Sequence, residues 1–299
     1  MNPSQSYRSW PWLLVFFLAC ACAHSRPEPG SDALPPRSSL LQGLGDTRYL
    51  RHESAHLGRD FHIYIRLPEE YIASPDTRFP VLYLLDGGNT YPMLAAFHHY
   101  LRLGEETPPA IVVGIAYGSE YYRGGNMRQT DFTAPAADRD FWGGAPDFQH
   151  VLEFELLPAV ERGFRADPAR RILFGHSLGG QFVLFNALTR PELFWGHIAS
   201  NPALHRNPEF FMKWRGGAGV GSPASNVFVS SGELEDARFR EPALKWMESW
   251  NEKPDLPWRL EVRTLAGQTH YSSAPEALRQ GLEWLYENGQ QAQDHQGRP

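Results

Sequence analysis

The chain has 299 residues, of which 42% are apolar and 21% are charged, so it is a globular protein long enough for a large core and not a disordered chain. Its 28 basic residues against 34 acidic ones give a net charge of −6. Nucleic-acid-binding proteins usually carry a basic surface, so we expect no nucleic-acid partner.

The first predicted segment is an export signal. Residues 12–21 are apolar throughout but too few to span a bilayer, which needs about 20 apolar residues, and an A-x-A-like cleavage site ends at Ala23. We expect a signal peptide over residues 1–23 and a Pro-rich linker over 24–47. Cys20 also fits a loose bacterial lipoprotein signal. The expected location is therefore periplasmic or secreted, with a lipid anchor as the only expected membrane contact.

From about residue 48, strand patterns alternate with helical ones. Predicted strands cover residues 61–67, 81–85, 110–116, 172–174, 198–200, 227–230 and 260–265, and predicted helices cover 147–164, 178–188, 239–250 and 275–286. This order predicts an α/β fold with a mainly parallel sheet and helices on both faces, in one domain over residues 48–288 followed by a polar tail over 289–299. Two long Gly/Pro-rich stretches, 117–146 and 201–225, are expected to be functional or mobile loops.

A predicted nucleophile follows the strand at 172–174. The segment Gly175-His176-Ser177-Leu178-Gly179 fits the G-x-S-x-G pattern of a nucleophile elbow, in which a serine occupies a strained turn between a strand and a helix. The pattern alone is common, but here a strand precedes it and an apolar helix follows. We therefore predict that Ser177 is a catalytic nucleophile.

A serine hydroxyl needs a base to take its proton, and folds with this elbow order the residues as serine, acid, histidine. His270 fits this order because it follows a predicted strand. His197 and His205 follow Ser177 too closely, and His295 lies in the tail. We therefore predict His270 as the base.

The acid that orients this histidine should follow the strand at 227–230. Three carboxylates stand there, at Glu233, Glu235 and Asp236. We predict Glu235 as the acid, with Glu233 and Asp236 as alternatives.

An oxyanion hole needs two backbone N–H groups aimed at the developing negative charge. One should come from Leu178, directly after the nucleophile. The other should come from the loop after the strand at 81–85, where two glycines let the backbone approach a ligand closely. We predict Gly88 for this position, with Gly87 as the alternative.

These residues resemble the esterase family of α/β-hydrolases that includes siderophore (ferric-enterobactin) esterases, feruloyl esterases, S-formylglutathione hydrolases and mycolyltransferases. The resemblance covers roughly residues 50–287 and is carried by the segments 58–60, 80–87, 128–133, 155–158, 175–180 and 232–235 and by His270. It implies an α/β-hydrolase fold that needs no cofactor. The family's acid commonly stands three residues after the glycine that closes its strand, which maps onto Glu235.

The siderophore branch is the most similar in its motifs, and its substrates are acidic trilactones. The resemblance therefore implies cationic residues near the cleft, for which the long loops offer Arg123, Arg128, Arg139 and Arg215. Aromatic residues of the same loops could bind aryl groups, or could simply attach the loops to the core. We expect Arg128, Trp142 and Trp214 to contact the substrate.

A second motif competes with this interpretation. His52-Glu53-Ser54-Ala55-His56 fits H-E-x-x-H, the zinc-protease signature, whose two histidines share one helix face, and His62 falls where an extended form has a third ligand. Gly58 would end such a helix, and residues 61–67 are strand-like. We therefore expect surface histidines in a first hairpin, and no metal site.

Together these observations predict an exported serine esterase that cleaves small-molecule carboxylic esters through an acyl-serine intermediate, with siderophore trilactones or aryl esters as candidate substrates. An acyltransferase uses the same residues and stays an alternative. A hydrolase-like binding module that has lost catalysis is a second one, which labelling with a fluorophosphonate would distinguish.

Overall fold

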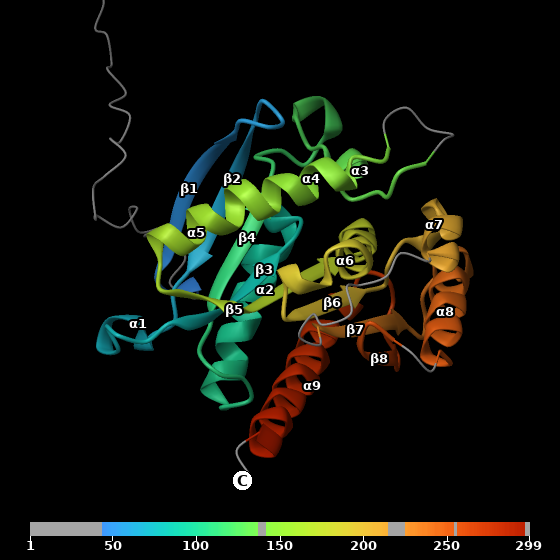
Figure 1. Ribbon diagram of the computed structural model, residues 1–299. Coiled ribbons are helices and arrows are strands. Elements are labelled where there is room, and N and C mark those ends of the chain that lie inside the picture. Colours follow the sequence, from blue (N-terminus) through green and yellow to red (C-terminus); the bar gives the residue numbers. More distant parts are fainter. Residues whose placement is uncertain (1–43, 137–141, 215–224, 254–255, 297–299) are drawn as a thin grey trace, which may run out of the picture. The chain divides into compact units, whose positions relative to one another are not determined.

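The structure is a computed structural model that describes residues 44–136, 142–214, 225–253 and 256–296 (Figure 1). The predicted signal peptide, the expected lipid anchor and nearly all of the linker lie outside these residues. No helix in the described part of the chain is long and apolar enough to cross a membrane.

One eight-stranded sheet organises the fold, in the order β1-β2-β4-β3-β5-β6-β7-β8. The strands are β1 (Thr47–Ser54), β2 (Arg59–Arg66), β3 (Phe79–Leu84), β4 (Ile111–Ala116), β5 (Ala166–His176), β6 (Gly196–Ser200), β7 (Ser225–Gly232) and β8 (Trp258–Leu265). β2 pairs antiparallel with β1 and with β4, and all other pairs are parallel. The predicted α/β class with a mainly parallel sheet is therefore confirmed.

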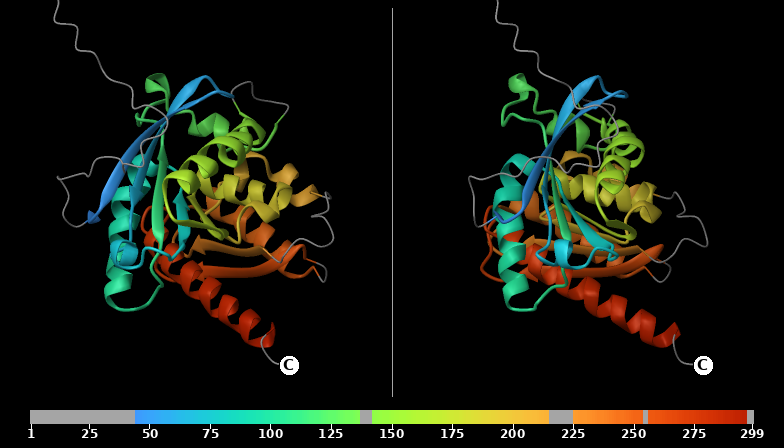
Figure 2. Two further views of the ribbon diagram at one scale, coloured as in Figure 1. Left: turned by 60° about the vertical axis from the view of Figure 1, so that its left-hand side comes forward. Right: turned by 90° about the vertical axis from the view of Figure 1, so that its left-hand side faces the viewer.

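Helices cover both faces of the sheet (Figure 2). They are α1 (Glu70–Ala73), α2 (Gly87–Leu103), α3 (Arg128–Asp131), α4 (Ala145–Val151), α5 (Leu157–Gly163), α6 (Leu178–Thr189), α7 (Pro208–Lys213), α8 (Ala237–Asn251) and α9 (Ser273–Gln296). Helices α2 and α9 lie against one face, and α4, α5, α6 and α8 lie against the other. Helix α2 had no counterpart among the predicted helices.

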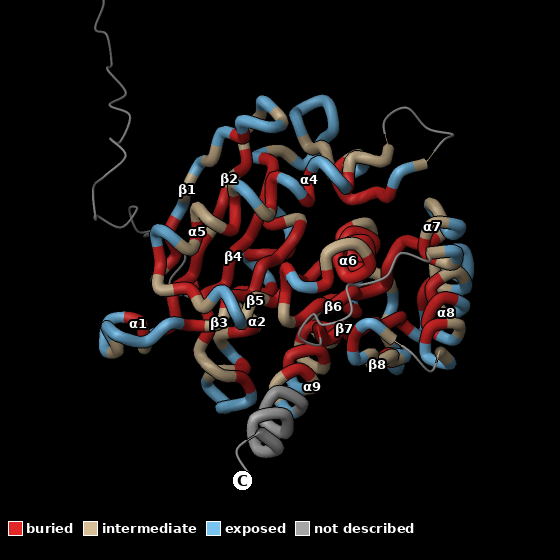
Figure 3. Tube along the Cα trace, in the orientation of Figure 1, coloured by how far each residue is buried: buried red, intermediate tan, exposed pale blue. Residues whose placement is uncertain are grey.

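The two faces of the sheet have separate apolar cores, because successive side chains of a strand point to opposite faces. In β3, Val81 and Tyr83 belong to the core under α4–α6 and α8, whereas Leu82 and Leu84 belong to the core under α2 and α9. Strands β3, β4, β6 and β7 are buried along nearly their whole length, and β5 is buried over residues 172–175 (Figure 3). This burial on both faces explains their continuous apolar sequences.

The helix expected over residues 147–164 is interrupted. Helix α4 ends at Val151, a π-helical turn spans Leu152–Leu156, and α5 begins at Leu157. Pro158 accounts for the break, because it has no N–H to donate to the carbonyl four residues earlier.

The polar tail expected over residues 289–299 is largely helical. Helix α9 continues through Gln296, so most of this segment is helical. A polar composition does not by itself end a helix when the residues are good helix formers, as the glutamines and alanine of this segment are.

Candidate active site

The predicted nucleophile lies in a tight turn between β5 and α6. Ser177 has φ +59° and ψ −115°, values that favour glycine and that other residues adopt only at an energetic cost. A Cβ on Gly175 would come within 2.2 Å of the carbonyl oxygen of Gly179. A Cβ on Gly180 would come within 2.8 Å of the carbonyl oxygen of Ser200. The glycines are therefore required, and the turn has the form of a nucleophile elbow.

The predicted base and acid are in direct contact. Nδ1 of His270 lies 2.6 Å from Oε1 of Glu235. The side chain of Glu235 is only 1% exposed, and its Oε2 accepts a hydrogen bond of 3.2 Å from the hydroxyl of Ser231. A carboxylate at this position holds the imidazole proton on Nδ1, which leaves Nε2 as the proton acceptor.

The two alternative acids have other partners. Glu233 is exposed, and its Oε2 accepts a hydrogen bond of 2.8 Å from the backbone N–H of Gly267. Asp236 caps α8 by accepting a hydrogen bond of 2.9 Å from the backbone N–H of Arg238. Of the three carboxylates, Glu235 is the one whose described contacts include His270.

Ser177 and His270 line one cavity of about 550 Å³, which we call the Ser177 cavity. Its walls come from the segments that follow β3, β4, β5, β6, β7 and β8, because the carboxyl ends of parallel strands meet at one edge of a sheet. Its lining includes Asp86, Arg128, Trp142, His176, Leu178, His205, Arg206, Arg238, Phe239 and Tyr271.

The predicted oxyanion amides lie at the first turns of two helices. Leu178 is the first residue of α6 and lines the Ser177 cavity, and Gly88 is the second residue of α2, next to Asn89 in the lining. Amides in a first turn have no acceptor within their own helix. A Cβ on Gly88 would meet nothing within 4 Å, whereas one on Gly87 would come within 2.6 Å of the nitrogen of Ile115. Gly88 is therefore the more open of the two predicted glycines.

Arg128 lines the Ser177 cavity, but its charge is compensated. Nε and Nη2 of Arg128 lie 2.7 and 2.9 Å from the two carboxylate oxygens of Asp86. Burial alone would lower the pKa of Arg128, but the charge and hydrogen bonds of Asp86 raise it overall. Asp86, at φ +54°, directly precedes Gly87. The ion pair therefore fixes the loop that carries the predicted oxyanion amide.

Arg128 is the first residue of the short helix α3, and the last residue of this helix, Asp131, is bonded to β2. The buried carboxylate of Asp131 accepts hydrogen bonds from Arg59 and, at 2.8 Å, from the hydroxyl of Tyr117. Burial raises the pKa of Asp131, although the charge of Arg59 opposes the shift. The segment 128–133 therefore anchors the long loop on two sides.

Of the two tryptophans predicted to contact the substrate, one lines the Ser177 cavity and the other does not. Trp142 lines the Ser177 cavity, and Cζ of Arg206 lies 4.6 Å from its ring centroid. Trp214 is not in this lining, and its ring packs against Phe210 with centroids 5.2 Å apart. Of the remaining loop arginines, Arg123 is exposed and outside the lining, whereas Arg139 and Arg215 lie outside the described residues.

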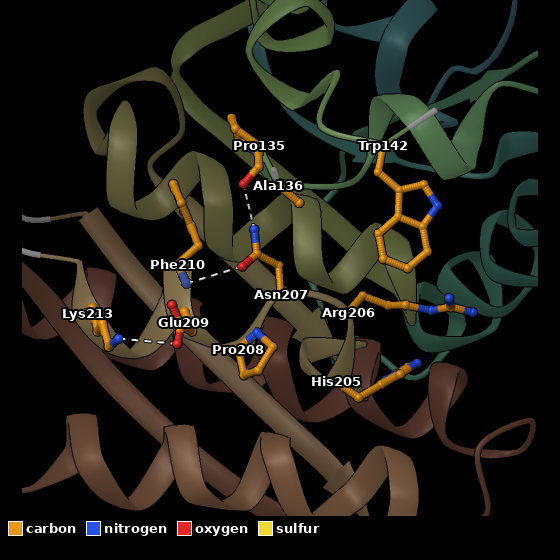
Figure 4. Close-up of a pocket in the computed structure, with 10 residues that line it drawn as sticks. All are labelled: Pro135, Ala136, Trp142, His205, Arg206, Asn207, Pro208, Glu209, Phe210 and Lys213. Atoms are coloured by element: carbon orange, nitrogen blue, oxygen red, sulfur yellow. Dashed lines mark hydrogen bonds and ion pairs between the residues drawn. The ribbon is translucent and has the colours of Figure 1, made fainter. Parts of the chain in front are cut away.

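A second cavity of about 690 Å³ shares Trp142, His205 and Arg206 with the Ser177 cavity (Figure 4). Nδ2 of Asn207 donates a hydrogen bond of 2.6 Å to the carbonyl oxygen of Pro135 across it. This bond joins the two long loops.

The H-E-x-x-H residues do not share a helix. His52 lies on β1, His56 lies in the turn after it, and His62 lies on β2. Nε2 of His52 is 2.9 Å from Glu155, and Nε2 of His56 is 2.9 Å from Asp147. Within the described ranges, no group of three or more His, Cys, Asp or Glu side chains has the arrangement of a metal site.

Sequence reasoning assigned no role to His176, Arg206 or Arg238, all of which line the Ser177 cavity. Burial, with the charges of Arg206 and Arg238 nearby, lowers the pKa of His205 to about 4. The position of His176 directly before Ser177 was the one sequence signal that could have drawn attention to it.

Comparisons with known proteins agree on one family. A family model described as a putative esterase matches residues 54–273. The ferri-bacillibactin esterase BesA of Bacillus subtilis is 32% identical over 251 residues, which cover 77% of this chain and 86% of that protein. The apo-salmochelin esterase of Escherichia coli is 28% identical over 223 residues, 68% of each chain.

Solved structures share the fold. The BES protein from Bacillus cereus aligns with a TM-score of 0.67 at 24% identity, over 85% of this chain and 98% of that chain. An IroE-like serine hydrolase from Shewanella oneidensis aligns with a TM-score of 0.68 at 23% identity, over 81% of this chain and 80% of that chain. The elbow, the histidine–carboxylate contact and the cavity therefore lie on the same fold as these proteins.

Proposed function

The chain belongs to the putative esterase family and is a carboxylic ester hydrolase, and from this premise we propose that it cleaves the ester bonds of a siderophore with Ser177, His270 and Glu235 as its catalytic triad. The observation that carries the triad is the 2.6 Å contact between Glu235 and His270, which lines the same cavity as Ser177. The named relatives support the substrate class.

In the proposed reaction, Oγ of Ser177 attacks the ester carbonyl carbon while Nε2 of His270 takes the hydroxyl proton. Glu235 keeps the other imidazole proton on Nδ1 and stabilises the imidazolium. Collapse of the tetrahedral intermediate breaks the ester C–O bond, and His270 returns the proton to the leaving alcohol. Water, deprotonated by the same histidine, then releases the acid and regenerates Ser177.

The carbonyl oxygen becomes negatively charged in both tetrahedral intermediates. The N–H groups of Leu178 and Gly88 are proposed to donate hydrogen bonds to it, since both lie in first turns of helices and have no partner within those helices. The positive ends of the α2 and α6 dipoles favour the same charge. The Asp86–Arg128 pair holds the α2 end of this arrangement in place.

The lining of the Ser177 cavity suits a flat anionic group. Arg206 lies over the ring of Trp142, and Cζ of Arg238 lies 4.4 Å from the ring centroid of Phe239. At such a site the cation can bind the negative charge of a catecholate or carboxylate, and the aromatic side chain can stack on the ring of a catecholate. We therefore propose that Arg238, at the start of α8, recognises the charge of the substrate, since the charge of Arg128 is compensated by Asp86.

The substrate test compares kcat/KM for a catecholate trilactone, an O-methylated trilactone of the same size without phenolate charge, a feruloyl ester and a long-chain acyl ester. We expect the charged trilactone to be cleaved most efficiently. Arg238→Gln should reduce its advantage over the methylated trilactone, whereas Lys245→Gln, an equal charge change on an exposed position of α8, should not. A higher value for the long-chain ester would refute the proposal.

Export is a separate proposal that the sequence of residues 1–23 supports. The mature chain should begin near His24, or at a lipidated Cys20. Mass spectrometry of the protein isolated from its native cells tests this. A full-length chain that keeps Met1 and stays in the cytoplasm would refute both forms of the proposal.

A further inference from the structure

The second cavity borders the Ser177 cavity directly. Trp142, His205 and Arg206 line both cavities, and Cζ of Arg206 lies 4.6 Å from the ring centroid of Trp142. Figure 4 shows these three residues on one side of the second cavity and Lys213 on the other. The three shared residues therefore form a border between the two cavities, which we call the junction.

The junction lies close to the proposed base. The ring centroid of His205 is 4.8 Å from that of Phe239, and the ring of Phe239 is in turn 5.3 Å from that of His270. One aromatic ring therefore separates the junction from the imidazole that is proposed to take the serine proton. A substrate whose ester bond lies at Ser177 can extend a neighbouring group past the junction through a short spacer.

Buried hydrogen bonds fix the loops of the second cavity relative to the nucleophile elbow. Gln181, on α6, is fully buried; its amide nitrogen donates a bond of 2.8 Å to the carbonyl oxygen of Ala203, and its amide oxygen accepts one of 3.3 Å from the N–H of Ala134. These two partners lie on the two long loops that meet at the cavity. The N–H of Ala203 also donates a bond of 3.0 Å to the carbonyl oxygen of Ser177. The second cavity is therefore held in place relative to the nucleophile, as a preformed binding site requires.

The size and lining of the second cavity suit an aromatic ring. Its volume of about 690 Å³ lies within the range of ligand pockets, about 300–1,000 Å³. Four flat apolar side chains line it, from Pro135, Trp142, Pro208 and Phe210. Nζ of Lys213 lies 3.2 Å from Oε1 of Glu209, and the two side chains are 72% and 77% exposed, so their charges offset each other at the open rim. Flat apolar surfaces favour an aryl group, which they bind by stacking and burial.

We propose that the second cavity binds a second aryl arm of the substrate while an ester bond of the same molecule is attacked at Ser177. The enzyme therefore favours esters built from several aryl-bearing hydroxy-acid units over esters with a single aryl group. The inference rests on the proposed function, because a catecholate trilactone is an ester of this kind, in which the bonds to be cleaved join the units that carry the arms.

The test uses three esters of two hydroxy-acid units, in which both units, only the acyl unit or only the alcohol unit carries a catechol arm. An acetyl group replaces the missing arm, so the bond to be cleaved is the same in all three. For the wild type, removal of the arm that occupies the second cavity should lower kcat/KM by roughly 10- to 100-fold, the effect of burying one aromatic ring. Ala136→Trp places a ring in this cavity, so in that variant removal of the same arm should change kcat/KM by less than about twofold. The kcat for 4-nitrophenyl acetate normalises each variant for changes in the chemical step.

Lys213→Trp fills the cavity from the side opposite the junction, in case Ala136→Trp does not fold. Lys245→Trp is its matched control, because it makes the same substitution at an exposed position of α8 outside the linings of both cavities. Lys213→Trp should reduce the effect of the arm, and Lys245→Trp should preserve it. Calorimetric titration measures binding without turnover: the two-armed ester should bind to Ser177→Ala roughly 10- to 100-fold more tightly than to Ser177→Ala combined with Ala136→Trp.

The inference is overturned if the wild type cleaves all three esters with kcat/KM values within about twofold of one another. It is also overturned if the effect of the arm persists in the folded cavity-filling variants, or if Lys245→Trp abolishes it as well. Failure of the proposed function looks different: the wild type would cleave none of the three esters, or Ser177→Ala would keep its activity.

Discussion

The Ser177 cavity has two walls that are built in different ways. The strand-end wall, formed by Ser177 and His270 with the buried Glu235 behind His270, stands on short turns after β5, β7 and β8, so the sheet sets its geometry. The loop wall, formed by Arg128, Trp142 and Arg206, stands on the two long segments between strands. Side-chain contacts hold this wall in place.

We expect the strand-end wall to carry the bond-breaking step and the loop wall to select the substrate. Bond breaking requires groups held within a fraction of an ångström, which a hydrogen-bonded sheet can supply. Substrate selection can use segments that vary in length and composition around a fixed scaffold. Changes in the strand-end wall should therefore reduce the cleavage of every ester, whereas most changes in the loop wall should alter the ranking of esters.

Ser177→Ala is the largest expected change. Removing the proposed nucleophile should lower kcat by about 10⁴- to 10⁶-fold for every ester and abolish fluorophosphonate labelling. The melting temperature should stay close to that of the wild type, because the hydroxyl has no described structural partner. If a contamination-free variant keeps more than a few per cent of the activity, Ser177 is not the nucleophile.

Glu235→Gln should have the next largest effect. A neutral amide no longer stabilises the imidazolium and can favour the wrong tautomer of His270, for a loss of up to about 10⁴-fold in kcat. Glu233→Gln and Asp236→Asn are matched controls two and one residues away, and we expect each to keep most of the activity. A larger loss of activity in Asp236→Asn than in Glu235→Gln would show that Glu235 is not the acid.

Arg128→Gln tests whether Arg128 supports the oxyanion loop or binds the substrate. If the Asp86–Arg128 pair holds the oxyanion loop, kcat/KM should fall by roughly 10- to 100-fold for neutral and anionic esters alike, with a lower melting temperature. Steady-state kinetics with the charged and O-methylated trilactones measure this. A loss confined to the charged trilactone would instead make Arg128 a substrate-binding residue of the loop wall.

The smallest expected effect concerns the histidines of the first hairpin, which belong to neither wall. Prolonged chelation should leave ester hydrolysis unchanged, and His52→Gln should change the unfolding free energy by less than about 1 kcal/mol through its contact with Glu155. Activity assays with a chelator, followed by added zinc, check this. Loss of activity in chelator with recovery in zinc would revive the metal hypothesis.

The strand-end wall was the part of the site that the sequence could predict. The elbow pattern and the apolar strand at 172–174 locate Ser177, and chain order after it selects His270. Three carboxylates follow β7 within a few residues, and local sequence does not say which one faces the histidine, so the family resemblance was needed to support the choice of Glu235 over its two neighbours.

The loop wall could not be predicted in this way. Arg128 and Asp86 are 42 residues apart, and nothing in the local sequence says that one compensates the other. Trp142 and Trp214 are both tryptophans of the long Gly/Pro-rich segments, yet Trp142 lines the Ser177 cavity and Trp214 packs against Phe210. The interruption after Val151 likewise depends on how one proline is accommodated by a widened turn.

The backbone of Ser177 has a consequence for engineering. A side chain held at φ +59° costs about 1–3 kcal/mol, and glycine would adopt the same conformation without that cost. Ser177→Gly should therefore be inactive and yet harder to unfold than the wild type. Selection for thermal stability alone would favour the dead enzyme at this position, so a library screened for heat resistance must also be screened for turnover.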